Sequence, residues 1–342
     1  MIEVINLVKK YGDHTAVKNI SFKVDTGKIY GFLGPNGAGK STTMNIMTGC
    51  LAATEGRVVI NGHDIFRDPI EAKKCIGYLP ELPPVYPDMT PYEYLRFVGK
   101  AKAVKKDELE EQIKDIMEMT GVDKVKDRLI KHLSKGYRQR VGLAQAIVGF
   151  PEIIILDEPM VGLDPKQIIE IRELIRELGK KHTVFLSSHI LSEVSAVCDY
   201  IMIISDGRLV ASDTPDNLSK MLKGNVLQLS VKGAKESVSK ALSKIKEVTK
   251  ITVTESGEEG IADVEIESKN DVRSDVFFAL CDARLPIMSL SNNKLSLENI
   301  FLELTEKKDD GKDVVDDSDD DDESGEEYTP LFTTDLKKKG ER

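Results

Sequence analysis

One stretch of the sequence decides the fold, Gly34-Pro35-Asn36-Gly37-Ala38-Gly39-Lys40-Ser41-Thr42. It matches the pattern G-x-x-x-x-G-K-[ST], and the apolar run Ile29–Leu33 before it is typical of a buried strand. Glycines let the backbone curl so that successive N–H groups and the following helix N-terminus surround phosphate oxygens. Lys40 brings a positive charge to the β- and γ-phosphates, and Ser41 offers a hydroxyl to Mg²⁺. This stretch, the phosphate loop, therefore predicts a nucleotide site after a strand.

Two carboxylates follow a second apolar run, Ile153–Leu156. Asp157 is placed to hold Mg²⁺ through water, and Glu158 is placed to orient and partly deprotonate an attacking water. An apolar strand that ends in Asp-Glu is a weak pattern by itself, because a strand-end turn is its common explanation. Together with the phosphate loop it predicts phosphoryl transfer to water.

The pattern from residue 1 to about 222 alternates short apolar strands with amphipathic helices, as in an α/β core. Further strands are expected at Val58–Ile60, Thr183–Ser187 and Ile201–Ile204. A helical block begins at Thr90, where Thr-Pro-Tyr-Glu forms a capping box, and we assign a helical subdomain to about 90–145. Internal packing and contact with a partner explain this block equally well.

A second domain is expected over 225–306, because strand and helix patterns follow one another there in the ferredoxin-like order βαββαβ. Its strands are expected at Val226–Val231, Val248–Thr254, Ile261–Ile266 and Ile287–Leu290. Its helices are expected at Ala234–Ile245 and Asp271–Ala283, with a final helix at Ser296–Glu306. The acidic segment 307–342 cannot bury enough apolar surface to fold, so we expect a disordered tail.

The net charge of −10 is local, because Asp309–Glu327 holds twelve acidic residues and one Lys, which sum to −11 and leave +1 elsewhere. Charge therefore argues neither for nor against a nucleic-acid partner. No run approaches the roughly 18 apolar residues that cross a bilayer. The N-terminus lacks the pattern of a secretion signal, so a cytoplasmic location is expected.

Between the two motifs lies a third, the signature segment Leu133-Ser134-Lys135-Gly136-Tyr137-Arg138-Gln139-Arg140. Ser134 followed by Gly136 at a helix start would present backbone N–H groups to an anion. Over residues 2 to about 220 the chain resembles the ABC ATPase family, whose signature sequence occupies this position. The resemblance implies an α/β P-loop NTPase fold with a helical subdomain, and ATP hydrolysis that depends on Mg²⁺.

The resemblance also implies roles for four further residues. Tyr11 would stack on adenine, and Glu81 stands where the family usually has a Gln that touches Mg²⁺ and the attacking water. Asp164 would lie in the loop that crosses the dimer interface, and His189 would sense the γ-phosphate.

Two departures from the family pattern concern the signature segment and position 81. The segment reads SKGY where the common form is SGGQ, but Ser134 and Gly136, which would face phosphate, are retained. Activity is expected to survive, with Lys135 and Tyr137 affecting its rate. Glu81 keeps an oxygen ligand for Mg²⁺ and adds a charge.

Family members pair head to tail, so that each ATP lies between one phosphate loop and the other subunit's signature segment. The resemblance thus implies a second ATPase subunit, a homodimer being favoured, and a polytopic membrane permease of an ABC-2 type exporter. The chain would then lie on the inner face of the cell membrane. The alternative is a soluble ABC-type ATPase acting on ribosomes or nucleic acid. Such proteins usually carry two cassettes or a basic surface, so no nucleic-acid partner is expected.

Overall fold

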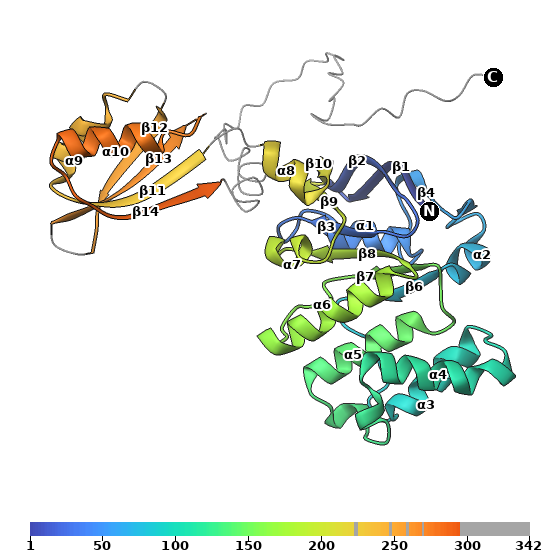
Figure 1. Ribbon diagram of the computed structural model, residues 1–342. Coiled ribbons are helices and arrows are strands. Elements are labelled where there is room, and N and C mark those ends of the chain that lie inside the picture. The colour runs from blue at the N-terminus through green and yellow to red at the C-terminus, as the bar shows by residue number, and fades with distance from the viewer. Residues whose placement is uncertain (222–224, 246–247, 258–259, 269, 295–342) are drawn as a thin grey trace, which may run out of the picture. The chain divides into compact units, whose positions relative to one another are not determined.

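The computed structural model describes residues 1–221, 225–245, 248–257, 260–268 and 270–294 (Figure 1). Contacts divide the chain into two compact units, one spanning Met1–Pro215 and the other beginning at Asp216. The expected helix Ser296–Glu306 and the acidic segment 307–342 lie outside the described residues. Within the described ranges, no helix combines the length and the apolar character that crossing a membrane requires.

A six-stranded sheet forms the centre of the first unit, in the order β10-β9-β3-β8-β7-β6. Its strands are β3 (Ile29–Leu33), β6 (Ile76–Leu79), β7 (Ile153–Leu156), β8 (Thr183–Ser188), β9 (Tyr200–Ser205) and β10 (Arg208–Asp213). All neighbours are parallel except β9 and β10. Every residue of β3 and β7 is buried, which explains their nearly unbroken apolar sequences. The strands expected here from the sequence are confirmed.

An antiparallel sheet in the order β2-β1-β4-β5 completes the core of this unit. Its strands are β1 (Ile2–Tyr11), β2 (His14–Val24), β4 (Glu55–Ile60) and β5 (His63–Asp64). Phe22 of β2 brings its ring centroid within 5.8 Å of Phe32 and 5.9 Å of Phe185, so the two sheets share one hydrophobic core. That shared core holds the β1–β2 hairpin beside the end of β3 where the phosphate loop begins.

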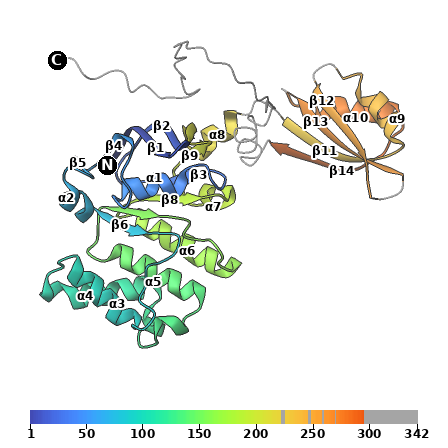
Figure 2. The ribbon, with the colours of Figure 1, turned by 180° about the vertical axis from the view of Figure 1, so that it is seen from behind.

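Seven α-helices accompany these sheets in the described residues, and α8 (Pro215–Met221) begins at the last residue of the unit before the boundary. Four of the seven are α1 (Lys40–Met47), α2 (Pro69–Lys74), α6 (Pro165–Gly179) and α7 (Leu191–Ser195). The other three, α3 (Pro91–Ala101), α4 (Lys106–Thr120) and α5 (Lys135–Ile147), gather at one end of the unit, away from β1, β2 and β4 (Figures 1 and 2). The capping box is confirmed, because Thr90 Oγ1 accepts from the Glu93 N–H at 3.3 Å and Glu93 Oε2 accepts from the Thr90 N–H at 2.9 Å.

The second unit has the expected order βαββαβ. Its elements are β11 (Asn225–Lys232), α9 (Lys235–Leu242), β12 (Val248–Glu255), β13 (Ile261–Ser268), α10 (Arg273–Asp282) and β14 (Ile287–Lys294). The strands form an antiparallel sheet in the order β12-β13-β11-β14. Apolar side chains from β11 and β13 pack with Val238, Val276 and Leu280 of the two helices, which makes a separate small core.

Candidate active site

The phosphate loop connects β3, in the interior of the six-stranded sheet, to α1. Gly39 precedes the helix with φ +101°, and a Cβ there would lie 2.6 Å from the carbonyl oxygen of Ala16, so only glycine fits. Lys40 is only 6% exposed, and its Nζ donates to the carbonyl oxygens of Gly34 at 2.8 Å and Pro35 at 3.2 Å. The loop is thereby closed around a buried ammonium group.

Asp157 and Glu158 follow β7, which lies two strands from β3 in the same parallel sheet. Asp157 Oδ1 accepts a hydrogen bond from Ser187 Oγ at 2.6 Å and from Ser41 Oγ at 3.4 Å. Burial raises the pKa of the Asp157 carboxyl above its ordinary value, an effect that outweighs these two hydroxyl donors. The Asp157 carboxylate after β7 and the Ser41 hydroxyl at the start of α1 thus face one another. A hard cation would find oxygen ligands there.

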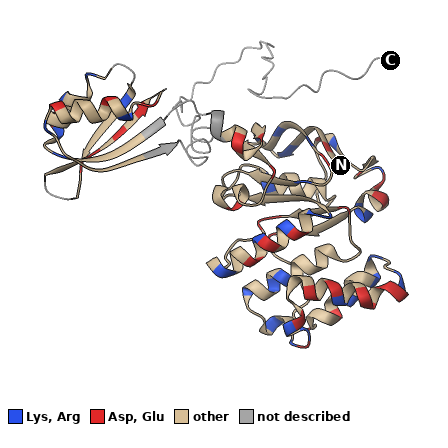
Figure 3. Cartoon of the chain, viewed as in Figure 1, with Lys and Arg blue, Asp and Glu red and all other residues tan. Residues whose placement is uncertain are grey.

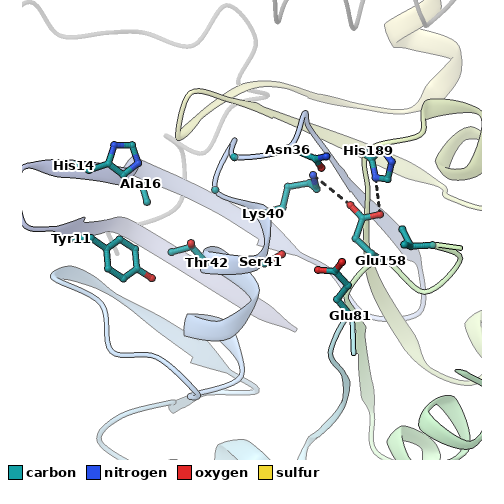
Figure 4. A pocket seen from close by; sticks show the side chains of 13 residues that line it. Tyr11, His14, Ala16, Asn36, Lys40, Ser41, Thr42, Glu81, Glu158 and His189 are labelled. Carbon is teal, nitrogen blue, oxygen red and sulfur yellow. Dashed lines mark hydrogen bonds and ion pairs between the residues drawn. The ribbon is translucent and has the colours of Figure 1, made fainter. Parts of the chain in front are cut away.

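Glu158 lies between two nitrogen-bearing side chains (Figure 4). Its Oε1 is 3.4 Å from Lys40 Nζ, and its Oε2 is 3.1 Å from His189 Nδ1. The carboxylate is 7% exposed, and the backbone at Glu158 has φ +48°, a strained value for a residue with a side chain. Strain of this kind costs about 1–3 kcal/mol and is found mostly at functional sites. The Glu158 carboxylate is therefore buried, held between an ammonium and an imidazole, and carried on a strained backbone.

The loop that carries His189 is fixed by buried hydrogen bonds. Ser188 Oγ donates to Glu193 Oε2 at 3.0 Å and accepts from the Ile190 N–H at 3.0 Å. Burial raises the pKa of the Glu193 carboxyl above its ordinary value. These bonds hold the imidazole of His189 at the edge of the site, over Glu158.

A cavity of about 600 Å³ extends from the Glu158 carboxylate across the phosphate loop (Figure 4). Tyr11, 49% exposed, lies at its far end, while Lys40, Ser41 and Glu158 lie at the near end with Glu81 beside them. The other predicted residues that line the cavity are Asn36, Gly37, Gly39, Thr42 and His189. Gly34 and Pro35 contribute carbonyls to Lys40, Ala38 is buried, and Asp157 lies beneath Ser41.

His14, Ala16 and Val161 line the cavity and Ser187 supports it, although none of them was predicted as a site residue. His14 is exposed, the hairpin pairs it with Tyr11, and it lines the same cavity. Ser187 was predicted only as the last residue of a strand, yet its hydroxyl donates to the Asp157 carboxylate and accepts from the Glu158 N–H, the latter at 2.9 Å. A polar residue at the end of a strand next to β7 was the only signal for Ser187.

Besides Gly34, Pro35, Ala38 and Asp157, which support the loop, three predicted residues lie outside the cavity lining altogether: Ser134, Gly136 and Asp164. Ser134 caps α5, where its Oγ accepts from the Tyr137 N–H at 3.4 Å. Asp164 caps α6, where its Oδ1 accepts from the Gln167 N–H at 2.9 Å. One chain therefore brings together the phosphate loop and both carboxylates, and presents the signature segment elsewhere.

Comparison with known proteins places this geometry in a family. The ABC transporter family model matches residues 17–161. The linearmycin resistance ATP-binding protein LnrL of Bacillus subtilis is 33% identical over 308 residues, which cover 89% of this chain and 98% of that protein. The bacitracin transport ATP-binding protein BcrA of Bacillus licheniformis is 38% identical over 222 residues, covering 64% of this chain and 72% of that protein.

Solved structures agree with the sequence relatives. An ATP-binding subunit of an ABC transporter has a TM-score of 0.60 and 31% identity, covering 65% of this chain and 92% of its own. The dimeric post-hydrolysis cassette MJ0796, bound to ADP and phosphate, has a TM-score of 0.57 and 25% identity, covering 63% of this chain and 98% of its own. The chain belongs to the ATP-binding proteins of ABC transporters, and it is an ATPase subunit of that family.

Proposed function

We propose that ATP binds in the 600 Å³ cavity with its adenine on Tyr11 and its phosphates in the phosphate loop. The observation that carries the proposal is the chain of contacts from Lys40 through Glu158 to His189 at the opposite end from Tyr11. An aromatic ring suits a nucleobase, and a buried ammonium within a glycine-rich loop suits polyphosphate. His14 lies at the nucleoside end of the cavity.

The residues fit Mg²⁺ as the accompanying ion. The oxygen ligands at this end of the cavity are those of Ser41 and Asp157, with Glu81 beside them. Among the described residues no group of three or more Asp, Glu, His or Cys side chains is arranged to hold a metal alone. That suits Mg²⁺, which is usually bound through one or two carboxylates together with substrate phosphates. Bound there, the ion would neutralise charge on the β- and γ-phosphates.

Hydrolysis then depends on releasing Glu158 from Lys40. Phosphate oxygens compete for the ammonium of Lys40, so ATP binding weakens its ion pair with Glu158 Oε1. The freed oxygen orients the attacking water and takes its proton, while His189 holds Oε2 and keeps the carboxylate aimed. Lys40 meanwhile stabilises negative charge on the transferred phosphoryl group.

The active unit in this proposal is a head-to-tail dimer. Ser134, Gly136 and Asp164 lie outside the cavity of their own chain, although Ser134 begins a helix whose N-terminus attracts anions. A second copy would supply them to the ATP of the first. The similar cassette MJ0796 has been solved as a dimer, which supports this arrangement.

The dimer is tested by measuring the ATPase rate per subunit of the purified chain against protein concentration. The rate should rise with concentration until dimers saturate, because a monomer holds only half of each site. A rate per subunit that stays constant down to concentrations at which the chain is monomeric would contradict the composite site.

We further propose that the dimer powers export through a separate polytopic permease, at the inner face of the cell membrane. Relatives named for linearmycin resistance and for bacitracin transport support export. Exposed apolar side chains near the helical subdomain suit a membrane partner, since Tyr86 is 50% and Phe97 45% exposed with ring centroids 5.5 Å apart. Charges of both signs are interspersed over α3 and α4, without a basic stripe for nucleic acid (Figure 3).

Changing Phe97 to Asp is expected to separate the ATPase from transport. A buried charge at an aromatic anchor should weaken permease binding by about tenfold or more, because such anchors dominate interfaces. The isolated dimer should keep its ATPase rate, since Phe97 does not touch the cavity. The measurement is ATPase stimulation by the co-purified permease, with Phe66→Asp, at another exposed aromatic, as the control. Equal ATPase stimulation of the Phe97→Asp and Phe66→Asp variants would show that the permease does not dock at Phe97.

Changing Asp157 to Asn is expected to stabilise the nucleotide-free chain while abolishing turnover. The folded-state pKa of Asp157 is raised, so its stabilising contribution is complete below the unfolded pKa of about 3.9 and is lost as pH rises through the folded value. At neutral pH the uncharged amide of the Asp157→Asn variant avoids this cost of burying a charge. An increase of about 1 kcal/mol in the free energy of unfolding would raise Tm by about 2–4 °C.

Thermal unfolding of both chains across a range of pH measures this effect. The difference in Tm should shrink toward acid pH, where Asp157 itself is protonated. Asp88→Asn is the control, because a hydrogen bond from Lys131 lowers the pKa of Asp88 and its amide variant should gain nothing. A Tm of Asp157→Asn below that of the parent at neutral pH would overturn the assignment of a buried, costly charge.

A further inference from the structure

The signature segment and the turn before α6 interlock within one chain. Gly162, in the turn that leads to Asp164, has φ +70°. A Cβ at Gly162 would lie 1.9 Å from Lys135 Nζ and 3.0 Å from its Cε. The end of the Lys135 side chain therefore occupies the space that a side chain at position 162 would need.

The reverse contact joins the same two segments. A Cβ at Gly136 would lie 2.5 Å from both Cδ and Oε1 of Gln167, on the first turn of α6. The Gln167 amide thus covers Gly136, just as Lys135 covers Gly162. Each segment thus places one side chain over a glycine of the other, with half-buried Gln167 over buried Gly136 and exposed Lys135 over exposed Gly162, so a shift of either segment breaks both contacts.

Two further contacts extend this connection to the catalytic carboxylate. Gln139 Nε2 donates to the carbonyl oxygen of Pro159, the residue after Glu158, at 3.0 Å in a buried position. Arg140 of α5 forms an ion pair with Glu170 of α6. The segment that would meet the partner's ATP is therefore packed against the segment that carries Glu158 in the chain's own cavity.

The charge of Lys135 has no evident structural use. Within the described residues no carboxylate lies within 4.0 Å of its ammonium. A cation at a helix start is disfavoured by the helix dipole. What the contact with Gly162 uses is the length and bulk of the side chain.

We infer that Lys135 and Gln167 are positioning residues, a reciprocal clasp that fixes Ser134 and Gly136 relative to the Asp164 turn and to Glu158. The inference rests on the head-to-tail dimer proposed above, in which Ser134 and Asp164 both meet the second subunit. When the signature segment closes on the partner's ATP, the clasp moves the Asp164 turn and the Glu158 loop with it. Each ATP site is thereby coupled to the other through the clasp.

The test compares Lys135→Ala, Lys135→Met and Gln167→Ala in the full chain, with Lys114→Ala, an exposed lysine of α4, as the control. Three quantities are measured: kcat at saturating protein, the protein concentration giving half the maximal rate, and MgATP affinity of the monomer. Lys135→Ala and Gln167→Ala should each lower kcat by roughly tenfold to a hundredfold, as misplaced groups far from chemistry do. Monomer affinity for MgATP should not change. Lys135→Met, which keeps the bulk, should retain most of the rate.

The combined Lys135→Ala/Gln167→Ala variant tests whether the two residues act as one device. The fall in kcat of the combined variant should be no greater than that of the slower single variant, because breaking the clasp once is sufficient. Losses that multiply, or Lys135→Met as slow as Lys135→Ala, would overturn the clasp and indicate that the ammonium contacts phosphate directly. If the ATPase rate per subunit of the parent chain does not depend on protein concentration, the dimer is refuted. This result is separate from the variant comparison, which tests the clasp.

Discussion

Replacing Glu158 by Gln is expected to lower ATP turnover by about 100- to 10,000-fold while ATP binding persists, the effect of losing a general base. The amide keeps the shape of the side chain but cannot accept a proton from water. It also removes the negative charge that pairs with Lys40 in the nucleotide-free chain. ATP should therefore bind at least as tightly and hold the two subunits together without being hydrolysed.

Two measurements check this result: phosphate release in single turnover, and size-exclusion chromatography with and without MgATP. The variant should elute as a dimer only with MgATP. Glu173→Gln, at an exposed position on α6, is the matched control and should turn over like the parent. Near-normal phosphate release by the Glu158→Gln variant would show that Glu158 is not the general base.

Mixing two inactive variants is expected to restore activity. Lys40→Ala disables the phosphate loop, and Ser134→Arg blocks the signature segment, so each homodimer should lose at least about 100-fold in rate. In a mixed dimer, the intact phosphate loop of one chain meets the intact signature segment of the other. Random mixing should then recover roughly a quarter of the parent rate, since half of the dimers carry one intact site.

Retained nucleotide provides a second readout for the mixing experiment. The mixed dimer should hold one nucleotide between both chains, and neither homodimer should, although the Ser134→Arg chain still binds ATP in its own cavity. The control mixes Lys40→Ala with Glu158→Gln. Each variant damages the cavity of its own chain, so the mixed dimer has no intact site. Restoration in that control as well, or none in either mixture, would contradict head-to-tail sites that each span both chains.

Much of the phosphate end of the site could be predicted from the sequence because it is local. The phosphate loop needs its glycines, Lys40 and Ser41 within nine consecutive residues, and Asp157 and Glu158 follow one buried strand directly. The strands β3 and β7 are buried on both faces, so their apolar runs were visible without any partner strand. The capping box at Thr90 is likewise a matter of four neighbouring residues.

The expected strand Val58–Ile60 is confirmed in β4, but β1 and β2 were harder to predict because their pairing is irregular. The register of β1 against β2 shifts three times between Val4 and Lys10. A shift of one residue moves side chains to the other face, which obscures the alternation that predicts a strand. The place of His14 beside the cavity could not be predicted for this reason, since it depends on its pairing with Tyr11.

The sequence by itself determined the chemistry of this protein: a buried cation in a phosphate loop, an acid pair after a strand, and a polar helix start. Tertiary structure alone decided which of these groups meet. It brought Lys40, Glu158 and His189 into one line of contacts, and it turned Ser134 and Asp164 away from their own cavity. The physical reason is that parallel strands bring their carboxyl ends to one edge whatever their distance in sequence, whereas the start of α5 is held by packing against α6.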